Sequence, residues 1–247
     1  MKINIINLRG HSIVVLIVLA LSGGCSKMET AFFYNPIQPL KLGPRVGNVI
    51  AVSQFRDERG TDYEDNSIYA ILPLVPFATY HHDRPGEKYG DHPGPGPPYH
   101  FQPSKDFAKD LAFDLRRSAL FSKVIYSEQG YPDGADYVIH GAIRSTKIKG
   151  KFFGYLISPF TGFMFLMGFP TGHSTNEVDL SVQLIDVQTK QIIWENSFQK
   201  KTSHLLGLYR NFKSPYAGYP VMIEEINKEI VTSVEKELRK WNRSEAQ

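Results

Sequence analysis

Six histidine and aspartate residues, whose side chains can bind metal ions, fall between positions 81 and 100 of the chain. They are His81, His82, Asp83, Asp91, His92 and His100. Imidazole and carboxylate groups are proper ligands for a borderline metal such as zinc. Adjacent histidines do not share a face of a regular element, however, so His81, His82 and His92 are weak candidates. We favour exposed loop histidines and expect no metal and no cofactor; a metal-binding protein remains an alternative.

The sequence patterns of common catalytic sites do not occur in this chain. It has no G-x-S-x-G, no H-E-x-x-H and no glycine-rich phosphate loop. His140 follows an apolar run, which favours a packed or partly exposed histidine over a general base. Two charged groups are expected to be solvated, one at the end of a strand and one on a helix: Arg56, Asp57, Glu58 and Arg59, and Asp110, Asp114, Arg116 and Arg117. We therefore predict no catalytic residue and no enzyme.

The only cysteine, Cys25, lies after an export signal. Lys2 and Arg9 precede the short apolar run 13–21, and small residues follow it, as in a secretory signal peptide. "LSGGC" resembles the lipobox of bacterial lipoproteins, although Ser22 stands where leucine is usual. That resemblance implies a signal peptide over 1–24 and acyl chains, palmitate among them, on Cys25. Ser26 is not the aspartate of inner-membrane retention, so by the same resemblance we expect the outer membrane, facing the periplasm.

The mature chain is nearly neutral. Loss of residues 1–24 removes Lys2 and Arg9, so 26 basic residues (28 minus 2) face 25 acidic ones. This balance gives no reason to expect a nucleic acid as partner. The proline-containing segment 25–45 is predicted to be a tether, followed by one domain over 46–241 and a polar tail over 242–247.

The first half of the domain is predicted to hold a strand near 46–55, a long loop, a helix and a further strand. Eight of the sixteen prolines lie between Pro73 and Pro103, so the loop 72–103 is expected to contain neither regular helix nor central strand. Ser104 suits a helix N-cap, and apolar residues then recur at helical spacing to about Phe121. A short strand at 123–128 and a longer one at 135–148 follow.

The second half is predicted to be a hairpin and a final helix. Val178, Leu180, Val182 and Leu184 alternate with polar residues, and 192–201 forms the returning strand. Pro220 suits a first helical turn. Apolar residues then follow one helix face: Ile223, Ile226, Ile230, Val234, Leu238 and Trp241. We predict an α/β (α+β-like) sandwich with a mixed sheet of about five strands and two main helices.

Three segments, "LRRSALFSKVI", "ADYVIHGAI" and "VDLSVQLIDVQTKQIIW", resemble the core pattern of a group of envelope lipoprotein domains. The group includes the curli secretion channel lipoprotein, the lipoproteins that activate penicillin-binding proteins, and the N-terminal domain of the Tol-system propeller protein. The resemblance covers roughly 46–198. It implies a non-enzymatic envelope lipoprotein that binds other proteins.

An apolar aromatic insertion, 152–173, interrupts this pattern. It has no Lys, Arg, Asp or Glu and carries Phe152, Phe153, Tyr155, Phe160, Phe163, Phe165 and Phe169. Glycines and prolines break it, so a spanning helix is disfavoured. We expect these seven residues to contact the membrane interface or a partner. The alternative is a broken helix or loop that covers one face of the sheet.

The sequence therefore predicts a lipid-anchored protein of the bacterial cell envelope that binds or assembles envelope proteins. A second possibility is an oligomeric secretion or transport component in which 152–170 inserts into the membrane or joins subunits.

Overall fold

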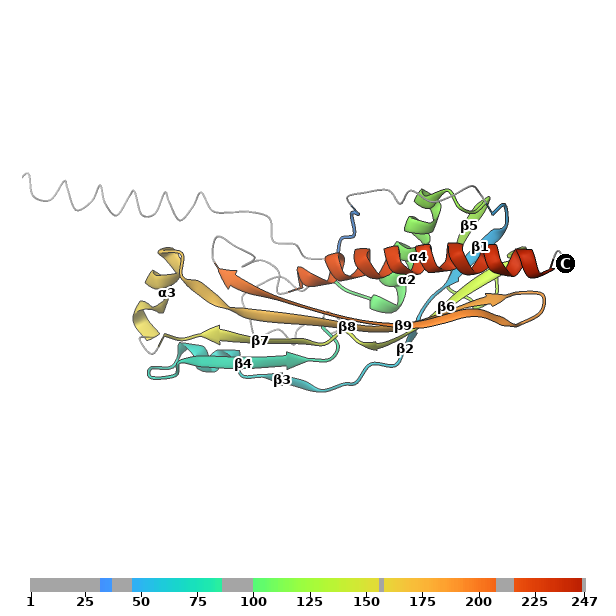
Figure 1. The fold of residues 1–247 in the computed structure, drawn as a ribbon. Coiled ribbons are helices and arrows are strands. Elements are labelled where there is room, and N and C mark those ends of the chain that lie inside the picture. Colours follow the sequence, from blue (N-terminus) through green and yellow to red (C-terminus); the bar gives the residue numbers. More distant parts are fainter. Residues whose placement is uncertain (1–31, 37–45, 86–99, 156–157, 208–215, 246–247) are drawn as a thin grey trace, which may run out of the picture.

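A computed structural model gives the fold and describes residues 32–36, 46–85, 100–155, 158–207 and 216–245. Within these ranges, nine strands form one sheet in the order β3-β4-β7-β8-β6-β1-β5, with β2 beside β6 and β9 beside β8 (Figure 1). Helices α2 and α4 lie together on one face. The mixed sheet confirms the predicted α/β class, with more strands than the five expected.

The body of the molecule is built on the parallel part of the sheet. β1 (Val49–Ser53) pairs in parallel with both β5 (Lys123–Ser127) and β6 (Tyr137–Ser145). The short β2 (Arg56–Asp57) continues the line of β1 along β6. Four of the five residues of β1 are buried, as expected for a central strand between two parallel neighbours.

Helices α2 (Pro103–Ser118) and α4 (Gly218–Glu245) cover the body. The predicted apolar face of α4 is confirmed, because Ile223, Ile226, Ile230, Val234 and Leu238 are fully buried, while Trp241 is half-buried. α2 begins one residue before the predicted cap, and the carboxylate of Asp106 accepts a hydrogen bond of 2.7 Å from the Gln102 N–H. α2 ends at Ala119, whose φ of 53° closes the helix in the left-handed region.

A long hairpin carries the sheet beyond the body. β8 (Pro170–Asp186) and β9 (Ile192–Gly207) pair over nearly their whole lengths. On its other side, β8 pairs with β6 near its end and with β7 (Ile148–Phe153) near its beginning. The predicted alternation of β8 is confirmed, since the four apolar residues 178, 180, 182 and 184 are buried.

Three further elements complete this extension. β4 (Phe77–His82) pairs antiparallel with β7 and with β3 (Tyr63–Asp65), and a 3₁₀ helix, η1 (Ser67–Ile71), precedes β4. The prediction that 72–103 contains no central strand is therefore wrong for residues 77–82. These six residues contain no proline and alternate between the two faces of the sheet, so every backbone N–H remains available for pairing.

The insertion 152–173 is also more regular than predicted. Its first two residues end β7, α3 (Ser158–Leu166) forms its middle, and its last residues begin β8. The interpretation as a cover over one face of the sheet does not describe it, because α3 lies at the far end of the sheet from the C-terminus (Figure 1).

Candidate functional site

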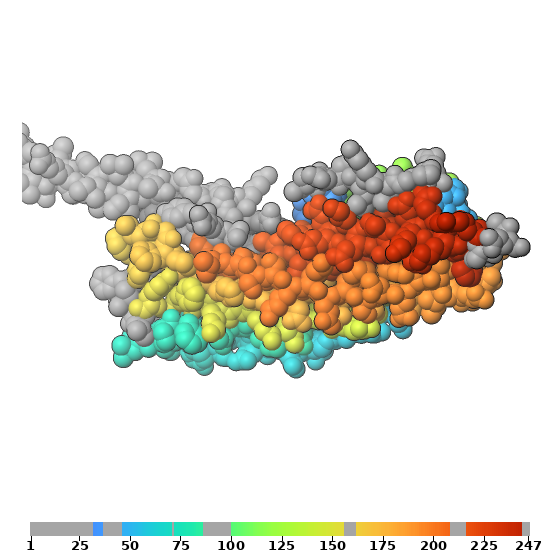
Figure 2. All heavy atoms as spheres, viewed as in Figure 1, coloured from blue at the N-terminus to red at the C-terminus, as the bar shows by residue number. Residues whose placement is uncertain are grey.

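The candidate site is the end of the sheet where η1 and α3 meet. η1 contacts α3, β4 and β7, so segments about 90 positions apart in the sequence join here. Figure 2 shows this end of the molecule beyond the body that α4 covers. We call it the apolar tip and define it by its large exposed apolar side chains. They are Ile68, Tyr69, Leu72, Leu74, Phe77, Phe163, Leu166, Met167 and Phe169.

Three residues show how far the tip departs from an ordinary folded surface. Leu74 is 79% exposed, Met167 65% and Phe163 63%. Leu74 also has a φ of 65°, in the left-handed region that a bulky side chain rarely adopts. Single exposed apolar side chains are normal, but nine at one end of a molecule indicate a binding surface.

Tyr155 organises the α3 side of the tip. Its hydroxyl donates a 2.6 Å hydrogen bond to the carbonyl of Pro170, which joins the end of β7 to the start of β8. Its ring lies 6.0 to 6.3 Å from those of Phe153, Phe165 and Phe169 in edge-to-face geometry. This arrangement suits aromatic quadrupoles. The aromatic residues of the insertion therefore build the support of the tip as well as its surface.

Gly154 fixes the η1 side of the tip. Its N–H donates to the carbonyl of Pro76 at 2.9 Å, and a Cβ at this position would lie 2.3 Å from the Val75 oxygen and 2.7 Å from the Ala70 oxygen. Both oxygens belong to the backbone, so they cannot move aside as a side chain can. The loop before β4 reaches β7 only because residue 154 is glycine.

Replacing Gly154 with alanine should therefore separate the 70–76 loop from β7. We expect faster amide hydrogen exchange at residues 70–76 and at position 154, with the body unaffected. Exchange mapped by mass spectrometry measures this. Gly162→Ala is the control, because a Cβ there meets nothing within 4 Å. Equal protection of 70–76 in both variants would contradict the close approach.

The seven predicted contact residues divide into distinct groups. Phe163 and Phe169 are exposed at the tip, whereas Phe153, Tyr155 and Phe165 are half-buried in its support. Phe152 packs on Tyr80, with ring centroids 5.2 Å apart, and is partly buried against the main core. The side chain of Phe160 lies outside the described residues.

Sequence reasoning missed the η1 half of the tip. Ile68, Tyr69, Leu72, Leu74 and Phe77 lie in a segment that was interpreted as a loop. A signal was present, because residues 66–80 contain no charged side chain, as in the insertion. One uncharged segment leads into β4 and the other follows β7. Because these strands pair antiparallel, both segments lie at the same end of the sheet.

The segment 32–36 is part of the fold, although it falls in the predicted tether 25–45. The Phe32 ring lies 5.2 Å from that of Phe101, and the Phe32 N–H donates to the His100 carbonyl. The Tyr34 hydroxyl donates to the Asp114 carboxylate, which also accepts 3.0 Å from Asn227. The signal peptide 1–24 and Cys25 lie outside the described residues.

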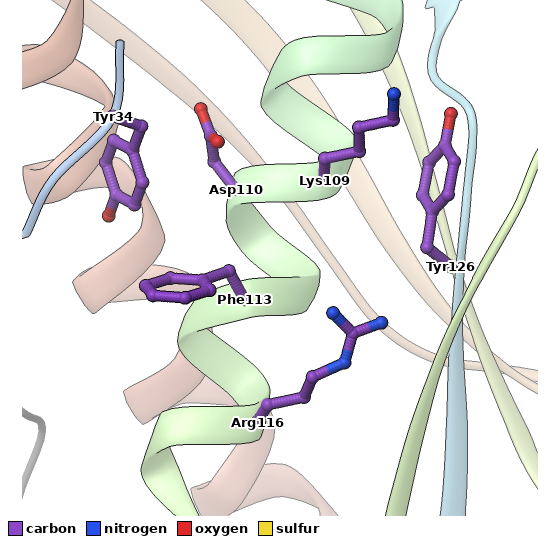
Figure 3. Close-up of a pocket in the computed structure, with 6 residues that line it drawn as sticks. All are labelled: Tyr34, Lys109, Asp110, Phe113, Arg116 and Tyr126. Carbon is purple, nitrogen blue, oxygen red and sulfur yellow. The ribbon is translucent and has the colours of Figure 1, made fainter.

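A pocket of about 420 Å³ opens beside this docked segment (Figure 3). It is lined by Tyr34, Lys109, Asp110, Phe113, Arg116 and Tyr126. Burial, followed by the charges of Asp106 and Asp114, raises the pKa of Asp110 to about 8. Asp110 Oδ2 is buried and has no hydrogen-bond partner among the described residues.

Asp114 corrects the expectation that the acidic residues of α2 are solvated. It is buried between Tyr34 and Asn227, and desolvation raises its pKa even though both neighbours donate hydrogen bonds to it. The network joins the 32–36 segment to both helices. The burial and the raised pKa of Asp114 therefore follow from its role in holding these segments together.

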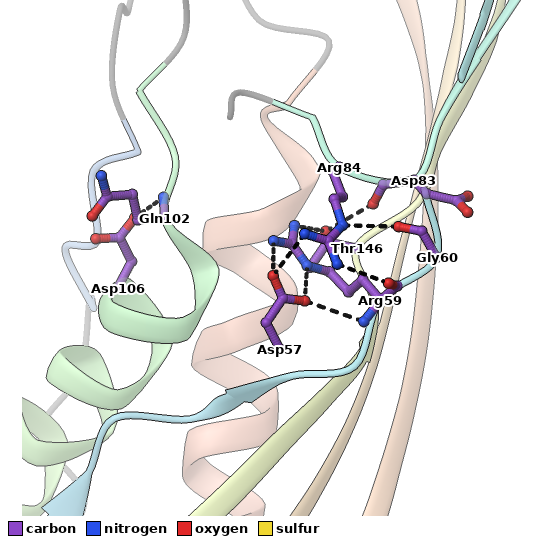
Figure 4. Close-up of polar contacts among 8 residues, drawn as sticks. All are labelled: Asp57, Arg59, Gly60, Asp83, Arg84, Gln102, Asp106 and Thr146. Carbon is purple, nitrogen blue, oxygen red and sulfur yellow. Dashed lines mark hydrogen bonds and ion pairs between the residues drawn. The ribbon is translucent and has the colours of Figure 1, made fainter. Parts of the chain in front are cut away.

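A second polar cluster lies where the body meets the extension (Figure 4). Arg59 is completely buried and forms two side-chain hydrogen bonds to Asp57, of 2.9 and 2.8 Å, and one of 2.7 Å to Thr146. The expectation of a solvated 56–59 loop is therefore wrong for Arg59. Burial alone would raise the pKa of Asp57, but the hydrogen bonds and charge of Arg59 outweigh it and lower the pKa.

The candidate metal ligands do not converge. His81 and His82 lie on opposite faces of β4, and His92 lies outside the described residues. His81 Nε2 instead lies 3.0 Å from Asp83 Oδ1, which also pairs with Lys147 at 3.2 Å. In the part of the chain that the structure describes, no three His, Cys, Asp or Glu residues form a metal-binding group.

His140 is half-buried, as predicted. Its Nδ1 lies 2.7 Å from the Ser53 hydroxyl, and its ring packs edge-to-face on Tyr131 at 5.0 Å. Burial, and then the charge of Arg56, lower its pKa. The Ser53 hydroxyl is buried and donates to the Ile139 carbonyl at 3.1 Å, so this pair joins β1 to β6.

Comparison with known proteins identifies the fold. No protein-family model matches the chain, and no curated protein matches it. The crystal structure of protein XCC0632 from Xanthomonas campestris, described with the family model DUF330, has 9% sequence identity and a TM-score of 0.52. The match covers 87% of this chain and 98% of that one. This chain therefore has a fold like that of the Xanthomonas protein.

Two other solved structures overlap less closely. The PelC dodecamer from Paraburkholderia phytofirmans has 13% identity and a TM-score of 0.35, covering 83% of this chain and 94% of that one. Lipoprotein GNA1162 from Neisseria meningitidis has 11% identity and a TM-score of 0.27, covering 75% and 99%. The fold assignment rests on the Xanthomonas protein. None of the helices in the described residues is long and apolar enough to cross a membrane.

Proposed function

We propose that this chain is a lipid-anchored protein of the bacterial envelope that works by binding other envelope components, without catalysis, and that the apolar tip is its binding surface. The tip carries the proposal, because nine large apolar side chains are exposed together there. The export signal and Cys25 of the sequence supply the anchor.

Three titratable groups with shifted pKa values, Asp57, Asp114 and His140, have structural roles, which is consistent with a binding protein. Asp57 and Asp114 are held in hydrogen-bond networks that join separate parts of the fold. The His140–Ser53 pair lies within the sheet. Perturbed pKa values also arise in structural networks, and each of these has such an explanation.

Photo-crosslinking in cells tests the proposal. With a photoreactive amino acid at position 163, the full chain should form adducts with envelope lipid or protein. The same amino acid at position 192 should form few, because Ile192 is equally a large exposed apolar residue but lies at the opposite end of β9. Radiolabelled palmitate should be incorporated by the natural chain and not by Cys25→Ala.

Two outcomes would contradict the proposal. Equal adduct yields at positions 163 and 192 would remove the special role of the tip. Absence of palmitate from the natural chain, with the protein released in soluble form, would remove the anchor.

A further inference from the structure

We infer that the apolar tip inserts into the headgroup region of the same bilayer that holds the acyl chains on Cys25, so that the protein attaches to that bilayer at two points. This inference rests on the proposed function and names the partner of the tip as lipid.

The distribution of charge favours lipid over a protein partner. No Lys, Arg, Asp or Glu occurs in 66–80 or in 152–172, the two segments that provide the tip. Burying a charged side chain in lipid costs several kcal/mol, whereas the rim of a protein interface is normally polar and charged. Aromatic residues also favour the boundary between headgroups and acyl chains.

Two lysine side chains lie directly behind the tip. Lys149 and Lys151 are exposed on one face of β7, and Lys151 Nζ lies 4.7 Å from the centre of the Phe77 ring. A side chain of this type can reach headgroup phosphates while its stem remains beside apolar residues. Anionic lipids attract such lysines near the membrane surface.

The shape of the tip also suits a bilayer. α3 projects past the ends of β7 and β8 (Figure 1). Four of the exposed side chains lie on α3 or directly after it, and the other five lie on η1, the loop 72–76 and the start of β4, at the same end of the molecule (Figure 2). The pocket described above is on α2, away from the tip. A protruding apolar end enters a fluid interface without requiring a complementary surface.

The length of chain between Cys25 and the docked segment 32–36 limits how far apart the lipid and the docked segment can lie. Phe32 is seven residues from Cys25 (32 minus 25), which allows a reach of at most about 25 Å. Phe32 packs on Phe101, and Phe101 stacks on Tyr219 at 5.0 Å. The Tyr219 hydroxyl donates to the Thr146 carbonyl, so the docked segment lies near the beginning of β7.

The tip lies at a similar distance from the beginning of β7, where the docked segment lies. The Glu177 N–H donates to the Lys147 carbonyl, and Pro170, where the tip begins, is seven residues away along β8 (177 minus 170). Seven residues of strand span about 23 Å. Because the reach of the linker matches this span, the lipid on Cys25 and the tip can contact one bilayer together. Ile192, at the other end of β9, then lies at the end of the sheet that is remote from the bilayer.

A fluorescent probe tests the insertion. The mature acylated protein is reconstituted in vesicles of phosphatidylethanolamine and phosphatidylglycerol, with a single environment-sensitive label at Met167→Cys or, as control, Ile192→Cys. Acylation blocks Cys25, so the introduced cysteine is the only thiol. We expect emission from position 167 to shift to shorter wavelength and to lose most of its intensity to lipid-borne quenchers. Emission from position 192 should not change.

A charged tip supplies a second measurement. Adding Phe163→Glu should abolish the quenching at position 167 while the acylated protein remains on the vesicles, and adding Ile192→Glu should leave it intact. Both substitutions are at exposed positions, so folding is retained.

Three outcomes would overturn the inference. The first is unquenched emission at position 167 on vesicles that carry the acylated protein. The second is a shift to shorter wavelength without quenching by lipid, which would place the tip against protein. The third is equal quenching at 167 and 192. In each case palmitate labelling and crosslinking at position 163 still report separately on the proposed function.

Discussion

Replacing Asp57 with alanine should lower the free energy of unfolding by about 3 kcal/mol, because it leaves the buried Arg59 guanidinium without its carboxylate. The side chain of Arg59 is 0% exposed, and its hydrogen bond to Thr146 would remain. The side chain of Asp57 is 25% exposed, so water can replace part of the interaction. We therefore expect the lower end of the range for a broken buried pair. Urea unfolding at neutral pH measures the change.

The pH dependence gives an independent check. The pKa of Asp57 is lowered in the folded state, so its contribution is fully present above its unfolded pKa of about 4 and is lost as pH falls through the folded pKa. The natural protein should lose this part of its stability on acidification, and Asp57→Ala should not. Asp133→Ala, at an exposed position, is the control. A loss below about 0.5 kcal/mol for Asp57→Ala, as at an ordinary surface site, would contradict the role of the pair.

Asp110 should make the protein less stable as pH rises, the opposite sign to Asp57. Its folded pKa is about 8, mainly because of burial, while the unfolded carboxyl titrates near 4. Between these values the unfolded chain loses a proton that the folded protein keeps, so the free energy of unfolding falls as pH rises. Four pKa units correspond to at most about 5 kcal/mol, and partial access of water to the pocket reduces this.

Asp110→Asn should remove most of that dependence, because the amide has nearly the same shape and does not titrate. Thermal melting of both proteins from pH 4 to pH 8 gives the comparison, with Asp133→Asn as the control. The comparison uses the slope of the melting temperature with pH. The absolute values are not compared, because the amide also brings a new donor that needs a partner and this changes stability at every pH. Parallel slopes for the natural protein and Asp110→Asn would show that Asp110 is ionised throughout.

The elements that the sequence predicts well are those in which hydrophobic periodicity decides the structure. The apolar stripe of α4 and the alternation of β8 each follow one buried face, so their residues could be assigned before the fold was known. The "Ala-Asp-Tyr" pattern also has a structural explanation, because the Asp136 carboxylate accepts a 2.7 Å hydrogen bond from the Val49 N–H and joins β6 to β1.

What the sequence does not predict depends on contacts between distant segments. Asp114 lies in a charged stretch typical of a solvated helix face, but it is buried between Tyr34, 80 positions away, and Asn227, which both donate to it. Arg59 is similarly enclosed by Thr146, which lies between β6 and β7. Only the α3 half of the tip was predicted. η1 is brought to α3 by the pairing of β4 with β7, and β4 was not predicted because Pro76 and Pro85 lie on either side of it.

The docked segment has a mechanical consequence. A force that pulls on the N-terminus enters the fold through residues 32–36. Phe32 is held by His100, directly before α2, and Tyr34 and Pro36 are held by Asp114, Asn227 and Arg117. α2 and α4 therefore carry the load first, and β1 is shielded from it. Because these helices pack across the sheet, such a load is shared by the whole core instead of peeling one strand away. The protein can be pulled by its N-terminal segment without unfolding from its first strand.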